Sequence, residues 1–214
     1  MLVLQTSQAG EHEVGPPPLP RLDDPWSIRV ARAWGEDLQR VHAWMSAPHV
    51  AARWGQAWPM RRWQAELAGQ LAGQHSRPCL VALDGEPFAY LEIYRVVRDR
   101  LAAHYPARPH DLGVHIAIGD PARCGSGLGS ALLRAVADGL LAAAPACSRV
   151  VAEPDEKNAA AVRAFGRAGF RAAGHVRLPH KTAALLVRPR DDADGLELLG
   201  PDGDDMPGRR GEES

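Results

Sequence analysis

Cysteine and long apolar runs are both scarce in this chain of 214 residues. Its three cysteines, Cys79, Cys124 and Cys147, are odd in number and lack metal or redox spacing, which argues against a disulfide framework and favours a reducing compartment. No apolar run approaches the roughly 20 residues that a membrane span requires, and the N-terminus has no charged lead-in to an apolar core. We therefore expect a cytoplasmic protein with no membrane partner and no bound metal.

Charge of one sign is not in excess either, because 25 basic and 26 acidic side chains give a formal net charge of −1. Residues 191–214 carry nine acids and two arginines, a net of −7, which leaves +6 for residues 1–190. The sequence has no basic helix or Lys/Arg cluster, so nucleic acid is not an expected partner, whereas a small polyanionic ligand suits the mild excess.

Length and composition predict a single domain. A chain that is 45% hydrophobic and 24% charged can bury one good core, but 214 residues are too few for two ordinary domains with tails. Five prolines mark residues 1–25 as a flexible N-terminal segment, and residues 191–214 read as an acidic disordered tail. The folded domain is expected over 26–190.

Hydrophobic periodicity and turn residues predict elements in the order βααβββαβαββ, which indicates a mixed α/β sheet. Helices are expected over 36–45, 59–74 and 158–168 and directly after the glycine-rich segment 125–129, with Ala47-Pro48 ending the first. The pair Asp84-Gly85 predicts a hairpin turn between strands 79–83 and 86–96. Further strands are expected over 28–33, 111–119, 149–153, from 169 onward and over 181–187.

The segment Gly125-Ser-Gly-Leu-Gly129 places three glycines between a strand and an amphipathic helix. Backbone N–H groups in such a turn, together with the positive end of the helix dipole, can hold a phosphate or pyrophosphate, although an ordinary tight turn is the alternative. The pattern is neither a Gly-Lys-Ser/Thr phosphate loop nor a dinucleotide fingerprint, which disfavours nucleoside triphosphates and nicotinamide cofactors. The predicted contacts are Gly125, Ser126, Gly127, Leu128, Gly129 and Ser130.

A histidine stands on the small-residue face of the preceding strand. Alternation puts Asp111, Gly113, His115 and Ala117 on one side and apolar residues on the other. Because histidine titrates near neutral pH, His115 could accept a proton from an amine as a general base, or merely orient a less basic N-hydroxyamine. A core histidine bonded to backbone is the alternative.

Three polar residues alternate along the strand before it. Tyr90, Glu92 and Tyr94 share one face, and if the two strands are antiparallel, that face also holds Asp111 and His115. The resulting pocket could bind a cationic amino acid. A partly solvated sheet face is the alternative.

The order of these features closely resembles the GCN5-related N-acetyltransferases (GNAT superfamily) over residues 28–188. The shared features are a strand, a glycine turn near Arg123, a helix, a second strand, then Asn158, Ala161 and Gly169-Phe170. The resemblance implies a GNAT fold, with six to seven strands, about four helices and splayed middle strands. It also implies acyl-CoA as cosubstrate, with its pyrophosphate on the glycine loop and its pantetheine arm between strands 114–119 and 149–153. Further contacts implied in this way are Ile116, Ala117, Ile118, Arg123 and Asn158. The family usually has Arg or Gln where Cys124 stands.

Four separated motifs resemble a narrower group, the hydroxamate-siderophore branch of mycobactin and aerobactin type. They are Trp44-Met-Ser-Ala-Pro-His-Val50 with Trp54, Tyr90-Leu-Glu-Ile-Tyr94 with Asp99, Asp111-Leu-Gly-Val-His115, and Glu153-Pro-Asp155 with Asn158. This branch acylates the side-chain amine or hydroxylamine of lysine, ornithine or a related diamine. The aminoglycoside 6′-N-acetyltransferases share some of these motifs but typically place an acid where His115 stands.

The resemblance implies roles for further residues. Asp155 is expected to orient His115 or help remove the proton, with a cap on the following helix as the alternative. His49 and Trp54 are expected to line the acceptor or acyl pocket. Lys181 could bind a phosphate or the carboxylate of the acceptor, although a solvated lysine is equally compatible with its position.

Together these features predict an acyl-CoA-dependent N-acyltransferase in which the acceptor nitrogen attacks the thioester directly. Backbone N–H groups around Ile116 would polarise the carbonyl, and the place of Cys124 in the phosphate loop argues against a covalent acyl-enzyme. The predicted partners are acyl-CoA and a small amine or hydroxylamine, bound by a monomer or homodimer. The alternatives are an aminoglycoside or other small-amine acetyltransferase and a non-catalytic acyl-CoA-binding module.

Overall fold

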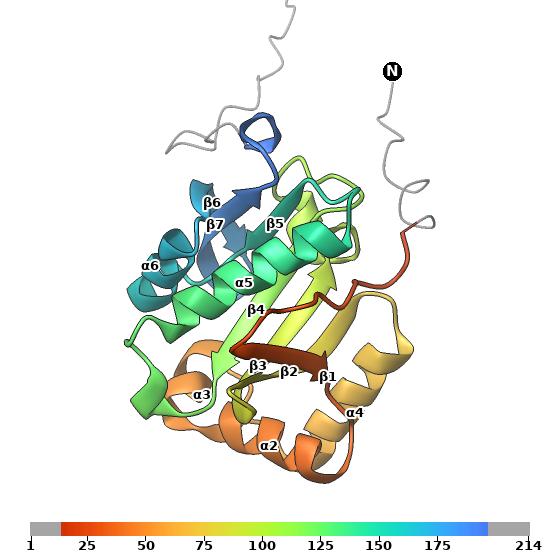
Figure 1. Cartoon of the computed structure of the whole chain (residues 1–214), viewed down its shortest axis with the longest axis vertical. Coiled ribbons are helices and arrows are strands. Elements are labelled where there is room, and N and C mark those ends of the chain that lie inside the picture. Colours follow the sequence, from red (N-terminus) through yellow and green to blue (C-terminus); the bar gives the residue numbers. More distant parts are fainter. Residues whose placement is uncertain (1–13, 197–214) are drawn as a thin grey trace, which may run out of the picture.

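The computed structural model describes residues 14–196, which form a seven-stranded sheet with helices on both faces (Figure 1). The spatial order is β1-β2-β3-β4-β5-β7-β6, and only β4 and β5 run parallel. The strands are β1 (Trp26–Val30), β2 (Ser76–Leu83), β3 (Glu86–Arg95), β4 (Leu112–Ile118), β5 (Arg149–Ala152), β6 (Arg171–Leu178) and β7 (Lys181–Pro189). The helices are α2 (Gly35–Ser46), α3 (Pro48–Trp54), α4 (Met60–Ala72), α5 (Leu128–Ala143) and α6 (Ala159–Arg167). Short 3₁₀ helices are η1 (Val96–Arg98), η2 (Arg100–Ala103), η3 (Pro121–Arg123) and η4 (Asp192–Asp194).

Helix α3 is absent from the predicted order. Ala47-Pro48 does end α2, as expected, but Pro48 is also the first residue of α3. Proline is favoured at that position because the first N–H of a helix has no intrahelical partner and the ring presets φ. The same dipeptide therefore closes one helix and opens the next, and a stop signal alone does not reveal the second.

Strand alternation divides the core between the two faces of the sheet. On one face Leu132 and Val136 of α5 pack in a cluster with Val114 of β4. On the other face Trp63 of α4 packs in a cluster with Ala117 of β4. Since residues 114 and 117 differ by an odd number, their side chains leave β4 on opposite sides, as the predicted alternation requires.

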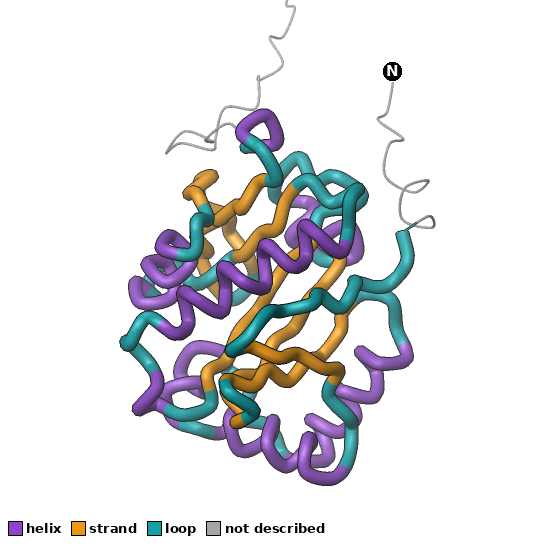
Figure 2. Tube along the Cα trace, viewed as in Figure 1, coloured by secondary structure: helices purple, strands orange, loops and turns teal. Residues whose placement is uncertain are grey.

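Residues 14–25 run as a loop along the sheet into β1 (Figure 2). Three arginine side chains donate hydrogen bonds to four consecutive carbonyl groups of this loop. The pairs are Arg98 with Val14 at 2.7 Å, Arg95 with Gly15 at 2.9 Å and Pro16 at 3.2 Å, and Arg77 with Pro17 at 2.7 Å. A proline-rich stretch forms no backbone ladder of its own, so its carbonyls are available to such donors. The described part of the segment expected to be flexible is thus held on the domain, and residues 1–13 lie outside the described range.

The first residues of the predicted acidic tail are described as well. Residue Asp194 of η4 pairs with Arg108 at 2.5 Å, and Asp192 pairs with Arg171 at 2.7 Å. Residues 197–214 lie outside the described range. Between residues 14 and 196, no helix combines the length and apolar character needed to cross a membrane.

Candidate active site

The parallel strands β4 and β5 pair at two positions only and then diverge. Leu112 pairs with Val150 and Gly113 with Val151, whereas β4 continues to Ile118. From residue 114 onward the β5-facing edge of β4 therefore borders a gap. The predicted splaying of the middle strands is confirmed, and such an edge offers backbone N–H and C=O groups to an extended ligand.

A cavity of about 560 Å³ opens at this gap. Seven of the residues predicted for the site line it, namely Trp54, Glu92, His115, Ile116, Asp155, Asn158 and Lys181. Glu153, which the sequence analysis gave no role, lines it too. Within residues 14–196, no cluster of three or more His, Cys, Asp or Glu side chains is arranged to hold a metal ion.

His115 lies between two glutamates, and each ring nitrogen faces one of them. Nε2 is 2.6 Å from Oε1 of Glu153, and Nδ1 is 3.2 Å from Oε2 of Glu92. Strand register explains the second contact, because Glu92 and His115 lie directly opposite each other on the antiparallel pair β3 and β4. A neutral imidazole has one N–H, so the two contacts are both hydrogen bonds only when a second proton is present in the cluster. We call these three residues the Glu–His–Glu group.

The charges of the Glu–His–Glu group stabilise one another. Burial alone would lower the pKa of His115, but Glu153 first and then Glu92 outweigh it and raise the pKa to about 10. Burial alone would raise the pKa of Glu153, yet His115 and Lys181 lower it to about 2. The pKa of Glu92 is lowered as well, because its contact with His115 helps to outweigh its burial. A pKa of about 10 would keep this histidine protonated at neutral pH, above the near-neutral titration expected from the sequence.

Two tyrosines hold the remaining carboxylate oxygens of the group. Tyr94 Oη donates to Oε2 of Glu153 at 2.7 Å, and Tyr90 Oη donates to Oε1 of Glu92 at 2.8 Å. Gln70 Nε2 also donates to Oε1 of Glu92, at 3.0 Å. Both tyrosines are buried, so the predicted direct contact of Tyr90 and Tyr94 with an acceptor is corrected. Alternation placed them on the right face, but Tyr90 packs with Trp63 of α4 and Tyr94 with Leu101 of η2, and their hydroxyls bond to the glutamates instead.

Lys181 is also engaged with the Glu–His–Glu group. Its Nζ donates to the main-chain carbonyl of Glu153 at 2.5 Å and lies 3.8 Å from Oε1 of that residue. A phosphate or carboxylate ligand for Lys181 stays a prediction, since the side chain lines the cavity while it contacts Glu153.

Asp155 lines the cavity but has no hydrogen bond to His115. Its Oδ1 accepts from the N–H of Lys157 at 2.8 Å, in the turn before α6. Asn158 caps that helix, with Oδ1 accepting from the N–H of Ala161 at 3.3 Å. His115 therefore pairs with Glu153 and not with Asp155, because the chain turns away after β5 and Asp155 joins the turn before α6. A part for Asp155 in removing the proton stays a prediction, since its side chain lines the cavity.

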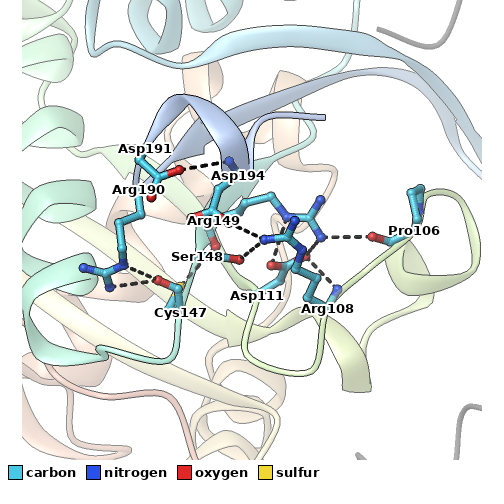
Figure 3. A network of polar contacts seen from close by, with 9 residues as sticks. All are labelled: Pro106, Arg108, Asp111, Cys147, Ser148, Arg149, Arg190, Asp191 and Asp194. Carbon is cyan, nitrogen blue, oxygen red and sulfur yellow. Dashed lines mark hydrogen bonds and ion pairs between the residues drawn. The ribbon is translucent and has the colours of Figure 1, made fainter. Parts of the chain in front are cut away.

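Asp111 lies outside the cavity, in a buried network at the other end of β4 (Figure 3). Arg149 donates to both of its oxygens, from Nε at 3.1 Å and from Nη2 at 2.7 Å. Tyr105 Oη and the N–H of Arg108 complete the shell at 2.9 and 3.0 Å. Asp111 is fully buried, so its predicted place in the acceptor pocket is corrected. It shares the face of His115, but the connection that carries Tyr105 and Arg108 covers it.

Trp54 and His49 have different outcomes. The ring of Trp54 lines the cavity and meets His115 edge-on, with centroids 5.8 Å apart. His49 is absent from the cavity lining, and its Nε2–H donates instead to the carbonyl of Ile118 at 2.9 Å. His49 therefore joins α3 to the end of β4, and its place in the acceptor or acyl pocket stays a prediction.

The glycine loop has backbone geometry that glycine alone adopts readily. Gly125 and Gly127 have φ values of +80° and +90°. Ala131 is the first residue of α5 to bond back, to the carbonyl of Gly127 at 3.1 Å, so the N–H groups of the preceding turn point out of the helix end. At position 129 a Cβ would lie 3.0 Å from Cδ1 of Ile118, which keeps this turn close to β4.

The side chains beside the loop are directed elsewhere. The guanidinium of Arg123 lies over the ring of Phe88, with its Cζ 5.3 Å from the centroid. Cys124 is exposed, and burial together with Asp120 raises the pKa of its thiol, which disfavours a nucleophilic thiolate. Backbone groups rather than side chains thus dominate this loop.

Glu153 is the functional candidate that the sequence analysis missed. Alternation along β5 puts it on the side of Val151, which packs in one cluster with Tyr94 below the histidine. The alternation of side chains along β5, continued by one residue past its end at Ala152, could have indicated that Glu153 points toward His115. Gln70 had none, because its contact with Glu92 depends on how α4 packs across the sheet.

The diverging strands, the glycine loop and the proton-transfer group in the gap together define an acyltransferase of the acyl-CoA-dependent class. A family model described as an acetyltransferase (GNAT) domain matches residues 34–178, and the chain belongs to this family.

The relatives agree with the narrower resemblance. The chain is 40% identical over 171 residues to the lysine N-acyltransferase MbtK of Mycolicibacterium paratuberculosis, which covers 80% of this chain and 76% of that one. It is 31% identical to the N(6)-hydroxylysine O-acetyltransferase of Escherichia coli, over 80% of this chain and 54% of that one. The aminoglycoside acetyltransferase AAC(6′)-Ib in complex with coenzyme A superposes with a TM-score of 0.70 at 25% identity, over 77% of this chain and 95% of that one. The resemblance to the hydroxamate-siderophore branch and the predicted fold class are confirmed.

Proposed function

We propose that this protein transfers an acyl group from an acyl-CoA to the side-chain amine or hydroxylamine of lysine, ornithine or a related diamine in siderophore biosynthesis. The observation that carries the proposal is the Glu–His–Glu group at the gap between β4 and β5, where a proton-transfer group borders a free strand edge. Relatives named lysine N-acyltransferase and N(6)-hydroxylysine O-acetyltransferase support this choice of acceptor.

The residues present fit acyl-CoA. N–H groups of residues 125–130 would hold the pyrophosphate at the start of α5, where the two positive-φ glycines expose the backbone. The edge of β4 over residues 116–118 would bond the pantetheine arm, and Asn158 lines the cavity on the opposite side of the gap. A CoA thioester supplies the activated carbonyl.

The acceptor nitrogen would attack that carbonyl directly, so that a C–N bond forms, the C–S bond breaks and coenzyme A leaves as the thiol. The Glu–His–Glu group takes the proton that the nitrogen loses and returns it to the departing thiolate. Because its members titrate together, the apparent pKa of about 10 belongs to the group and its base form is scarce at neutral pH. For a weakly basic hydroxylamine, which is largely uncharged already, the group would mainly orient the acceptor. N–H groups near Ile116 would stabilise the developing oxyanion.

A coupled thiol-release assay with acetyl-CoA tests the proposal. The acceptors are N6-hydroxylysine, N-hydroxyornithine, N-hydroxycadaverine, lysine and the aminoglycoside ribostamycin. We expect turnover of amino acids or diamines, and a loss of about 10²–10⁴-fold in kcat for His115→Ala. Calorimetric affinity for coenzyme A should stay unchanged in that variant. Turnover of ribostamycin alone would contradict the siderophore assignment.

An aminoglycoside acetyltransferase is the second candidate. The fold shared with AAC(6′)-Ib favours it, and the same assay separates the two activities. The Glu–His–Glu group argues for the first candidate, because the aminoglycoside enzymes typically place an acid where His115 stands.

A further inference from the structure

Some charged side chains in the cavity form hydrogen bonds or ion pairs within the protein, and others do not. Its carboxylates all accept hydrogen bonds from the protein. Glu92 and Glu153 belong to the Glu–His–Glu group, Asp99 accepts from the N–H of Leu101 at 2.9 Å, and Asp155 accepts from that of Lys157. The cations His115 and Lys181 are taken up by Glu153. Each of these carboxylates thus has at least one donor within the protein.

Two arginines in the lining are unengaged. Arg53 ends helix α3 and Arg100 begins η2, and both are exposed. Neither forms a hydrogen bond or ion pair with another residue of the described range, unlike Arg29 and Arg149. The cavity thus offers two guanidinium groups that have no anionic partner in the described range, and their planar shape suits bidentate binding of a carboxylate.

Arg53 and Arg100 lie on the side of the cavity where the acceptor would bind, and not beside the pantetheine arm of the thioester. An arm lying between β4 and β5 is flanked by those strands and by α6. Arg53 and Arg100 come from neither strand, but from α3 and from the connection between β3 and β4. Trp54, next to Arg53, meets the ring of His115, so α3 borders the place where the attacking nitrogen must lie.

We propose that Arg53 and Arg100 bind the carboxylate of an amino-acid acceptor and thereby select it over the corresponding diamine. This inference rests on the proposed function and narrows its substrate class. A free carboxylate could also belong to the acyl group, as in a succinyl donor, and the experiment below separates these two sources.

The test compares N6-hydroxylysine with N-hydroxycadaverine, which differ only by the carboxylate, and acetyl-CoA with succinyl-CoA. We expect the parent to prefer N6-hydroxylysine by about 100-fold or more in kcat/KM, because a site built to bond a group discriminates against its absence. In Arg100→Gln and Arg53→Gln this preference should fall about tenfold, with Arg100→Lys restoring part of it. The KM for acetyl-CoA and the melting temperature should not move.

Arg61→Gln is the matched control, since Arg61 lies on α4 outside the cavity lining and the charge change is the same. Equal use of both acceptors by the parent overturns the inference while the proposed function stands. A preference that the arginine variants leave intact overturns it too, as does a change that follows the acyl donor instead of the acceptor. If the parent acylates none of N6-hydroxylysine, N-hydroxyornithine, N-hydroxycadaverine and lysine with either donor, the proposed function itself fails.

Discussion

The ring of Tyr94 fills the space that any side chain at position 113 would need. A Cβ atom built on Gly113 would lie 1.9 Å from Cζ of that ring. The two residues lie directly opposite each other on β3 and β4, and the hydroxyl of Tyr94 is bonded to Glu153. The glycine thus lets a tyrosine cross the strand to reach a glutamate of the active site.

Replacing this glycine should damage stability and activity together. We expect Gly113→Ala to lower the free energy of unfolding by about 1–3 kcal/mol or more, because the buried ring must leave its rotamer. Denaturant titration measures this loss, and kcat should fall as Tyr94 releases Glu153. Gly69→Ala is the control, since a Cβ there meets nothing within 4 Å and alanine suits a helix interior. A Gly113→Ala protein as stable as the parent would contradict this packing.

The pH dependence of activity should reflect the raised pKa of His115. With lysine as acceptor, kcat/KM should keep rising through pH 8 and 9 instead of levelling above 6.5, because the imidazolium is lost only near pH 10. NMR titration of the His115 ring measures the same group directly.

Glu153→Gln separates this titration from that of the substrate amine. Removing the strongest charge partner should lower the pKa of His115 by at least about one unit, and the alkaline limb should move with it. Glu156→Gln is the control, because Glu156 pairs only with His175, at 3.9 Å. An inflection of the parent ring near pH 6.5 would show that the two carboxylates do not hold the proton.

Asp111 should prove structural. Asp111→Ala leaves the buried guanidinium of Arg149 without its partner, which typically costs about 3–5 kcal/mol. Thermal unfolding should show this loss, while the KM for the acceptor in the protein that remains folded stays near the parent value. Asp192→Ala, at an exposed ion pair with Arg171, should change stability by less than about 1 kcal/mol. A raised KM with unchanged stability would restore Asp111 to the acceptor pocket.

The loop over residues 14–25 should contribute to stability. Deleting residues 1–20 removes all four hydrogen bonds from Arg77, Arg95 and Arg98, and we expect a loss of about 2–4 kcal/mol in the free energy of unfolding. Deleting residues 1–13 removes none of these bonds and serves as the control. Equal stability of the two shortened proteins would mean that the arginines are as well satisfied by water.

Local pattern was enough to predict much of this fold. Alternation along β3 and β4 placed Glu92 and His115 on one face of the sheet. The Asp84-Gly85 turn predicted the hairpin that pairs β2 with β3. The glycines after β4 likewise predicted the start of α5.

Local pattern could not predict which of several nearby carboxylates reaches the active site. Asp111 and Glu92 occupy the same face, yet one is covered by a connection that closes only in the folded chain. The choice of Glu153 over Asp155 depends on the path of the chain after β5 leaves β4, which no periodicity encodes. Arg149, which pairs with Asp111 across 38 positions of sequence, depends on the same tertiary geometry.

The two-residue pairing of β4 with β5 also makes this junction the least strongly paired place in the sheet. β1 to β4 form one continuous antiparallel block, and β5, β7 and β6 form another, and within residues 14–196 the only backbone pairing between the two blocks is the seam at residues 112–113 and 150–151. Opening of that seam would break neither block's own ladder, and amide exchange should find it weaker than the strands on each side. A substrate arm bonded along the seam would add the hydrogen bonds that the chain itself omits, so occupancy of the site and cohesion of the domain would rise together.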